Sequence, residues 1–180
     1  MLKISKFKCL LSLLILFLCG CSPETQSQGM ASAEAKTALQ HFSVQKTEAE
    51  WKQLLPEQTF DVMRKQGTER AFSGKYDNNK EDGIYFCAAC GNHLYDAKHK
   101  YDSGTGWPSF YKPLESARIG TKDDYGLLGS KRTEVHCARC GGHLGHVFND
   151  GPKPTGLRYC MNSVALNFRK RNEIAPPLLK

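Results

Sequence analysis

The sequence lacks an apolar run long enough to cross a membrane as a stable helix, which takes about 20 residues. Its most apolar stretch covers only residues 9–18, so a permanent transmembrane anchor is disfavoured. It also lacks internal repeats, apart from two matching cysteine motifs. With 40% hydrophobic and 24% charged residues in a chain of 180, the composition is that of a globular protein with one compact core.

The sequence also has no cluster of Lys and Arg interleaved with aromatic residues, the pattern expected of a nucleic-acid binder. The formal charge is +7, but residues 1–20 hold three lysines and no acids, which leaves 22 basic and 18 acidic residues, or +4, in the rest of the chain. We therefore predict a solvated basic surface and no nucleic-acid partner.

Residues 1–20 have the pattern of a signal peptide, because three lysines precede the short apolar run. The run ends in Leu18-Cys19-Gly20-Cys21, which resembles the bacterial lipoprotein box, in which a small residue precedes a cysteine that is lipidated and becomes the mature N-terminus. Cys19 departs from the small or β-branched residue that is usual at its position. Cys21 is the predicted lipidation site.

Beyond the signal peptide, residues 21–40 are rich in Ser, Thr, Gln and Ala with only scattered apolar residues. They cannot bury enough surface to fold, so we expect a flexible tether. The predicted folded domain covers residues 41–170, and residues 171–180 form a C-terminal tail. These features predict an exported bacterial protein on the periplasmic side, anchored to a membrane through its N-terminal lipid.

The domain should begin with two short helices. Thr47 and Glu50 match a capping box, in which each side chain satisfies a free N–H of the first helical turn, and this helix should run to about Leu55. Pro56 can open a second helix at its first position, and Gly67 is placed to stop it.

After the helices, the pattern changes to short segments of alternating, β-branched and aromatic residues separated by Asn, Asp, Gly and Pro. This pattern predicts a mainly β body of antiparallel strands. The candidate strands are Gly83–Phe86, His99–Asp102, Ala117–Lys122, Arg132–His136, His143–Phe148 and Leu157–Phe168.

Four cysteines form two Cys-x-x-Cys-Gly motifs, with Cys87 and Cys90 in the first and Cys137 and Cys140 in the second. This spacing lets two thiolates of one turn take adjacent corners of a zinc tetrahedron. Four thiolates fill the coordination shell and leave no position for substrate, so such a site is structural. We predict one zinc ion that holds two distant hairpins together.

Other assignments of these four cysteines are open. Two disulfides would suit an oxidising compartment, and redox-active Cys-x-x-Cys centres are known, although these usually begin a helix and not a β-turn. A zinc site made by the second motif with His143 and His146 would leave Cys87 and Cys90 unexplained.

Cys160 is the remaining thiol of the predicted domain, and a single thiol with histidines elsewhere in the chain is a candidate nucleophile. A free cysteine can equally be buried and inert. In an extended segment Arg158, Cys160 and Asn162 share a face. Arg158 can then lower the thiol pKa, and Asn162 can hydrogen-bond beside it. Apolar residues continue on this face over 164–168, so either the face passes into the core or a bulge intervenes.

His143 and His146 lie close to the second cysteine motif, in the glycine-rich stretch 141–146. Three positions apart, they would lie on opposite faces of a regular strand. Gly145 can permit a bulge that brings them together. Either imidazole can then supply a proton.

Several motifs together closely resemble those of the B-type methionine sulfoxide reductases. Besides the two cysteine motifs they are Ser-Gly-Thr-Gly-Trp-Pro-Ser-Phe at 103–110, His-Leu-Gly-His-Val-Phe at 143–148 and Arg-Tyr-Cys-Met-Asn at 158–162. The resemblance covers about residues 42–168. It implies a mainly β fold of two antiparallel sheets with short N-terminal helices, and a structural zinc site away from the active site.

The resemblance implies a peptide-methionine (R)-S-oxide reductase that repairs oxidised proteins, and we expect it to act as a monomer. Cys160 would attack the sulfoxide sulfur of the R epimer and be left as a sulfenic acid. His143, His146 and Asn162 would bind or protonate the departing oxygen.

Three further roles follow from the same resemblance. Trp107 would form an apolar wall against the substrate methyl group, with Phe148 as a second substrate-binding residue. Arg158 matches the family position thought to favour the thiolate.

Thr105 is a departure from the family pattern, because many members have a cysteine there that resolves the sulfenic acid as a disulfide. Recycling would therefore need an external thiol reductant, such as a thioredoxin-like protein. The alternatives are a non-catalytic zinc-ribbon binding module and a scaffold lipoprotein. Neither explains Trp107, the two histidines and Cys160 together.

Overall fold

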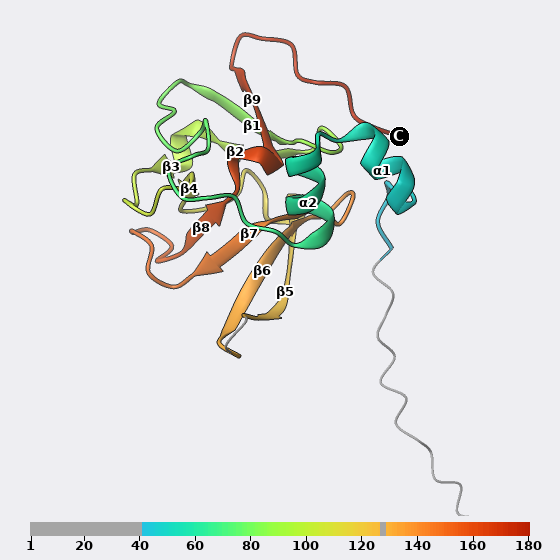
Figure 1. Cartoon of the computed structure of the whole chain (residues 1–180). Coiled ribbons are helices and arrows are strands. Elements are labelled where there is room, and N and C mark those ends of the chain that lie inside the picture. The colour runs from blue at the N-terminus through green and yellow to red at the C-terminus, as the bar shows by residue number, and fades with distance from the viewer. Residues whose placement is uncertain (1–40, 127–128) are drawn as a thin grey trace, which may run out of the picture. The chain divides into compact units, whose positions relative to one another are not determined.

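The computed structural model describes residues 41–126 and 129–180. The predicted signal peptide, Cys21 and the tether lie outside these residues. In the described part, two α-helices precede a body of short strands and 3-10 turns (Figure 1). None of the helices described is long and apolar enough to cross a membrane.

The first helix, α1 (Glu48–Leu54), has the predicted capping box. The Thr47 N–H donates to Glu50 Oε2 at 2.7 Å, and the Glu50 N–H donates to Thr47 Oγ1 at 3.3 Å. Both bonds satisfy groups that have no partner inside the helix, so the prediction of this helix start is confirmed.

The second helix, α2 (Glu57–Lys65), differs from expectation at both ends. Pro56 is the N-cap and not the first helical residue, and the left-handed residue at the C-terminus is Gln66, with φ 57°. Gly67 is needed for a different reason, since a Cβ there would lie 3.0 Å from the Asp61 carbonyl oxygen. The helix therefore ends at Lys65, two residues before the glycine.

The strands form two antiparallel sheets, which confirms the predicted fold class. The larger sheet has the strand order β3 (Lys100–Tyr101), β4 (Ser109–Phe110), β8 (Arg158–Met161), β7 (His143–Phe148), β6 (Lys131–Cys137) and β5 (Ile119–Tyr125). The smaller sheet has the order β2 (His93–Asp96), β1 (Gly83–Cys87) and β9 (Leu166–Lys170).

The prediction of one strand over Leu157–Phe168 is wrong, because this segment crosses from one sheet to the other. β8 ends at Met161, the 3-10 turn η3 (Ser163–Ala165) follows, and β9 pairs with β1. The Asn162 N–H bonds to the Leu144 carbonyl, while the Asn162 carbonyl accepts the Ala165 N–H and closes the turn. Apolar residues 164–168 therefore enter the core without sharing the face of Cys160.

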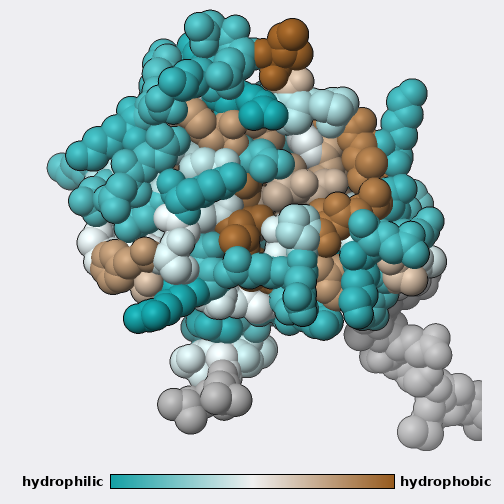
Figure 2. Space-filling model, turned by 45° about the horizontal axis from the view of Figure 1, so that its top comes forward, coloured by the Kyte–Doolittle hydropathy of each residue, from teal (hydrophilic) through white to brown (hydrophobic). Residues whose placement is uncertain are grey.

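The core is built from residues of both sheets and both helices. Tyr95 stacks on Phe110 with ring centroids 4.4 Å apart, and its hydroxyl donates to Met161 Sδ at 3.2 Å. α2 contacts β7 and η3. The largest fully buried side chains include Trp51, Phe60, Met63, Tyr85, Tyr95, Phe110, Val135, Leu144, Met161 and Leu166. Hydrophilic residues cover most of the surface shown in Figure 2, and hydrophobic residues gather near its centre.

The end of the chain packs back against the cysteine motifs. The Leu179 N–H donates to the Cys90 carbonyl at 3.1 Å. Arg139, inside the second motif, donates to the carbonyls of both Leu179 and Cys90. Residues 171–180, expected as a simple tail, thus reach the region of the predicted metal site.

Candidate active site and four-cysteine cluster

Cys87, Cys90, Cys137 and Cys140 form one cluster, with all four Sγ atoms within 4.8 Å of one another. Each is at most 2% exposed and none is in a disulfide. Two sulfur pairs lie 3.7 and 3.6 Å apart. Zn–S bonds of about 2.3 Å in a tetrahedron place sulfurs about 3.8 Å apart, so the cluster fits a structural zinc ion.

The glycine that ends each Cys-x-x-Cys-Gly motif is explained by the backbone conformation at its position. Gly91 and Gly141 have φ of 72° and 67°, in the left-handed region that glycine adopts without strain. Their N–H groups bond back to the carbonyls of Cys87 and Cys137. The two turns close the β1–β2 and β6–β7 hairpins, so the cluster joins the two sheets as predicted.

A bulge in β7 places both histidines on one face of the larger sheet. His143 lies opposite His136, but Gly145 lies opposite Val135, so Leu144 is an extra residue in the ladder. A Cβ on Gly145 would lie 2.0 Å from the Cys160 carbonyl oxygen, which explains the glycine. The bulge predicted from Gly145 is confirmed, and the two imidazole centroids are 5.3 Å apart.

Cys160 faces the same side, directly opposite His146 on β7 and Ser109 on β4. Burial raises the pKa of its thiol, and the charge of Arg158 and the hydroxyls of Thr105 and Ser109 oppose this rise without cancelling it. As expected, the charge of Arg158 lowers the pKa of the Cys160 thiol, but the larger effect of burial leaves that pKa raised. At neutral pH the thiol form dominates, and turnover needs a base.

Two further contacts hold the Arg158 side chain in place. Its guanidinium donates two hydrogen bonds to Asp150, at 2.9 and 2.8 Å. It also lies over the Phe148 ring, 4.4 Å from the centroid. Arg158 is thereby held at the rim of the site beside Cys160, with part of its charge balanced by Asp150.

His146 is the imidazole opposite Cys160 that lines the same cavity. Its Nε2 lies 2.8 Å from Asp124 Oδ2, and Arg132 bonds the same carboxylate. These two partners lower the pKa of Asp124. Burial is the main cause that lowers the pKa of His146, despite the opposing bond to Asp124. A neutral His146 with Nε2–H donated to the ionised Asp124 leaves Nδ1 as the proton acceptor.

His143 lies behind His146 and is 2% exposed. Its Nδ1 lies 2.9 Å from Glu134 Oε1, and Lys122 pairs with the second oxygen of that carboxylate at 3.0 Å. Although burial alone would raise it, these bonds lower the pKa of Glu134. His143 is not among the residues that line the cavity beside Cys160, whereas His146 is.

The cavity beside Cys160 has a volume of about 160 Å³ and brings together most of the predicted site residues. Its lining residues are Thr68, Trp107, Arg132, His146, Phe148, Cys160, Met161 and Asn162. Asn162 Nδ2 donates one N–H to the Leu144 carbonyl, and Oδ1 accepts the Glu69 N–H. The amide also carries a second Nδ2–H, which is a further hydrogen-bond donor.

The sequence prediction missed Thr68, Asp124, Arg132 and Glu134. A signal existed for two of them, because Arg132 and Glu134 alternate with His136 on a predicted strand and therefore share its face. Asp124 lies just beyond the predicted end of its strand. Thr68 is in a loop with no pattern that indicates a site.

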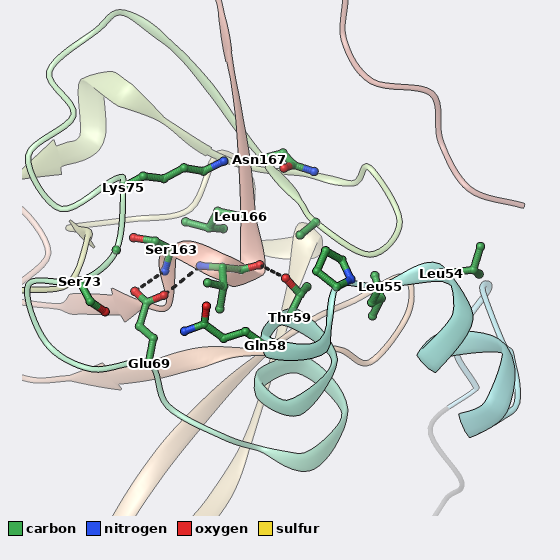
Figure 3. A pocket seen from close by; sticks show the side chains of 14 residues that line it. Leu54, Leu55, Gln58, Thr59, Glu69, Ser73, Lys75, Ser163, Leu166 and Asn167 are labelled. Atoms are coloured by element: carbon green, nitrogen blue, oxygen red, sulfur yellow. Dashed lines mark hydrogen bonds between the residues drawn. The ribbon is translucent and has the colours of Figure 1, made fainter.

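A larger groove, about 520 Å³, lies along the two helices and η3 (Figure 3). Its fourteen lining residues include no cysteine and no histidine. The groove therefore offers no thiol, and the thiol chemistry belongs to the smaller cavity.

The fold and the two cysteine sites define a class: a β-rich domain with a buried four-thiol cluster and a separate thiol paired with a histidine. Residues 55–170 match the SelR domain family. The chain belongs to this family, which confirms the main part of the resemblance seen in the sequence.

Relatives with known names agree over most of their length. The chain is 53% identical over 131 residues to a protein of Methanosarcina barkeri, covering 73% of this chain and 92% of that one. It is 57% identical over 131 residues to a protein of Pseudomonas syringae pv. syringae, and 48% identical over 130 residues to one of Leptospira interrogans, covering 72% of this chain and 98% of the relative in both cases. All three are named "Peptide methionine sulfoxide reductase MsrB".

Proposed function

We propose that this protein reduces methionine R-sulfoxide in oxidised proteins to methionine, with Cys160 as the nucleophile. The observation that carries the proposal is the pairing of Cys160 with His146 across two strands, at a cavity lined by the Trp107 indole and the Asn162 amide. Membership of the SelR domain family and the names of the relatives support the same reaction.

Substrate binding uses the two kinds of wall in the cavity. The S-methyl group packs against Trp107, and Phe148 contacts the rest of the side chain. The sulfoxide oxygen accepts the second Nδ2–H of Asn162 and points to His146. An apolar wall on one side and donors on the other favour one arrangement at the tetrahedral sulfur, which accounts for a preference for one epimer.

The chemical step begins when His146 Nδ1 takes the Cys160 proton. The thiolate attacks the sulfoxide sulfur, and His146 returns the proton to the oxygen as the S–O bond breaks. The oxygen leaves as hydroxide, and a bond between Sγ and the methionine sulfur remains. The hydroxide then adds to Sγ, that S–S bond breaks, and methionine departs with its electron pair. In sum, one oxygen moves from methionine to Cys160: the methionine sulfur gains two electrons, and Cys160 loses two and becomes a sulfenic acid.

Recycling uses two external thiols, as a thioredoxin-like protein would supply. The first attacks the sulfenic acid, forms a mixed disulfide and releases water, and the second reduces that disulfide. Thr105 offers no thiol. In residues 41–126 and 129–180, the other cysteines are the four of the buried cluster. These four would hold one zinc ion, which supplies structure and no chemistry to the reaction.

A steady-state assay with a peptide containing either sulfoxide epimer and a dithiol reductant tests this function. We expect methionine from the R epimer only, and none from Cys160→Ser. If wild-type protein with a full complement of zinc binds the oxidised peptide without turnover, the binding-module alternative is correct.

We also propose that the chain is exported, processed after residue 20 and anchored by a lipid on Cys21, with residues 21–40 as tether, 41–170 as catalytic domain and 171–180 as tail. The lysines before the apolar run and the small residue before Cys21 support this. Labelling with a fatty acid in a bacterial host should mark the wild-type chain and not Cys21→Ser. Equal labelling would contradict it. Light scattering of the purified protein should give a monomer.

A further inference from the structure

Glu69 is a buried carboxylate that the proposed reaction does not use. It is 4% exposed and forms no ion pair with any described residue. It lies in the segment that follows α2 and lines the larger groove (Figure 3), while its neighbour Thr68 lines the cavity of Cys160. A buried charge without a cation costs stability unless its oxygens are hydrogen-bonded.

The carboxylate is bonded to the first turn of η3. Oε1 accepts the Ser163 N–H at 2.6 Å, and Oε2 accepts the Val164 N–H at 3.0 Å. These bonds fix the segment around Glu69 to the chain immediately after Asn162. They also offset the cost of burying the carboxylate, because it can accept two N–H donors at once and charge-assisted bonds are the stronger kind.

The backbone of Glu69 reaches the active site on its other side. Its N–H donates to Asn162 Oδ1 at 3.0 Å, and its carbonyl accepts the Trp107 indole N–H at 3.1 Å. A third bond, from the Phe72 N–H to the Gly106 carbonyl at 2.8 Å, fixes the same segment to the Trp107 loop. One residue thus contacts the indole wall, the oxygen-binding amide and the turn between the two sheets.

We propose that Glu69 is a positioning residue that holds Trp107 and Asn162 at the separation that a methionine sulfoxide requires. This inference rests on the proposed function. The carboxylate binds the turn, and the backbone of the same residue sets the orientation of the two side chains that touch substrate. Losing the carboxylate frees segment 68–72 to shift, while Cys160 and His146 stay paired in the larger sheet.

Glu69→Gln is the sharpest substitution, because it keeps the shape but turns one acceptor into a donor that faces an N–H. We expect KM for an R-sulfoxide peptide to rise as the Trp107 wall moves, and kcat to fall as Asn162 loses its orientation. The combined loss in kcat/KM should be about 10- to 100-fold. Alkylation of Cys160 by iodoacetamide, which needs no sulfoxide pocket, should stay within about twofold of wild type.

Thr59→Val is the matched control. Thr59 Oγ1 donates to the Val164 carbonyl at 3.2 Å, on the α2 side of the same turn (Figure 3). This variant weakens η3 without touching Glu69, Trp107 or Asn162. A role in stability alone would lower activity similarly in both variants, whereas positioning affects Glu69→Gln only. If Glu69→Gln does not fold, Glu69→Asp takes its place. It keeps the charge on a shorter side chain, so we expect the same effect on kcat/KM at a smaller size.

The full chain should be used, with ¹⁵N NMR of the indole N–H as a second measurement. The Trp107 resonance, assigned by its absence in Trp107→Phe, should shift in Glu69→Gln and stay in place in Thr59→Val. Wild-type kinetics and an unshifted resonance in Glu69→Gln would overturn the inference. Wild-type protein that fails to reduce either epimer would instead overturn the proposed function, so the two failures are distinguishable.

Discussion

The pair of Asp124 and His146 gives the most quantitative prediction. Asp124 Oδ2 lies 2.8 Å from His146 Nε2, and the imidazolium formed during turnover would face that carboxylate. Asp124→Asn keeps an acceptor oxygen but removes the charge. A hydrogen bond to a charged group contributes about 1.5–3 kcal/mol and a neutral one about 0.5–1.5 kcal/mol. The loss is therefore about 1–1.5 kcal/mol, or about 5- to 13-fold in rate at 1.36 kcal/mol per decade.

Arg132 would add to this loss of rate, because its guanidinium bonds the Asp124 carboxylate and its charge lowers the pKa of His146. Without the carboxylate this charge is no longer balanced, so fivefold is the smallest loss expected. The assay is the single-turnover rate of methionine formation from an R-sulfoxide peptide at pH 7. It isolates the step at Cys160 from recycling.

Asp123→Asn is the control, since Asp123 is the neighbour on β5, is exposed and forms a surface pair with Lys131 at 3.0 Å. Such pairs contribute about 0–1 kcal/mol to stability, and this one is remote from the cavity. We expect no change in its single-turnover rate. Equal rates for Asp124→Asn and Asp123→Asn would refute the role of the imidazolium.

Three further predictions concern the thiols. Cys87→Ser should lose zinc and have a lower melting temperature, as metal analysis and thermal unfolding would show. Cys160→Ser should keep its zinc and its melting temperature but lose turnover. The reverse pattern would contradict the assignment of the cysteines. Thr105→Cys should lose two free thiols per turnover where wild type loses one, because the Thr105 hydroxyl contacts Cys160; loss of only one would mean that the loop cannot reach. Arg158→Met should raise the Cys160 pKa further. Since the thiolate fraction grows as pH rises towards that pKa, iodoacetamide alkylation at pH 7 should slow, and an unchanged rate would exclude the charge effect.

Local signals in the sequence predicted the elements that depend on them. The capping box at Thr47, the paired Cys-x-x-Cys-Gly motifs and the bulge at Gly145 each rest on a few adjacent residues, and the structure agrees with all three. The alternation of Arg158 and Cys160 likewise predicted their shared face.

Tertiary contacts decided what the sequence did not predict. The break after Met161 arises because Asn162 bonds to Leu144 on another strand, which no local pattern records. β4 has two residues and no periodicity. The raised pKa of Cys160 reflects burial, whereas the sequence showed only the neighbouring charge of Arg158.

The measurement that tests the central claim most directly is a single-turnover reaction of the full chain with the two epimers of a methionine sulfoxide peptide, without reductant. Sulfenic acid is trapped chemically and located by mass spectrometry. We expect methionine from the R epimer alone, with one adduct per chain on Cys160. Methionine without an adduct on Cys160, or equal reduction of both epimers, would contradict it.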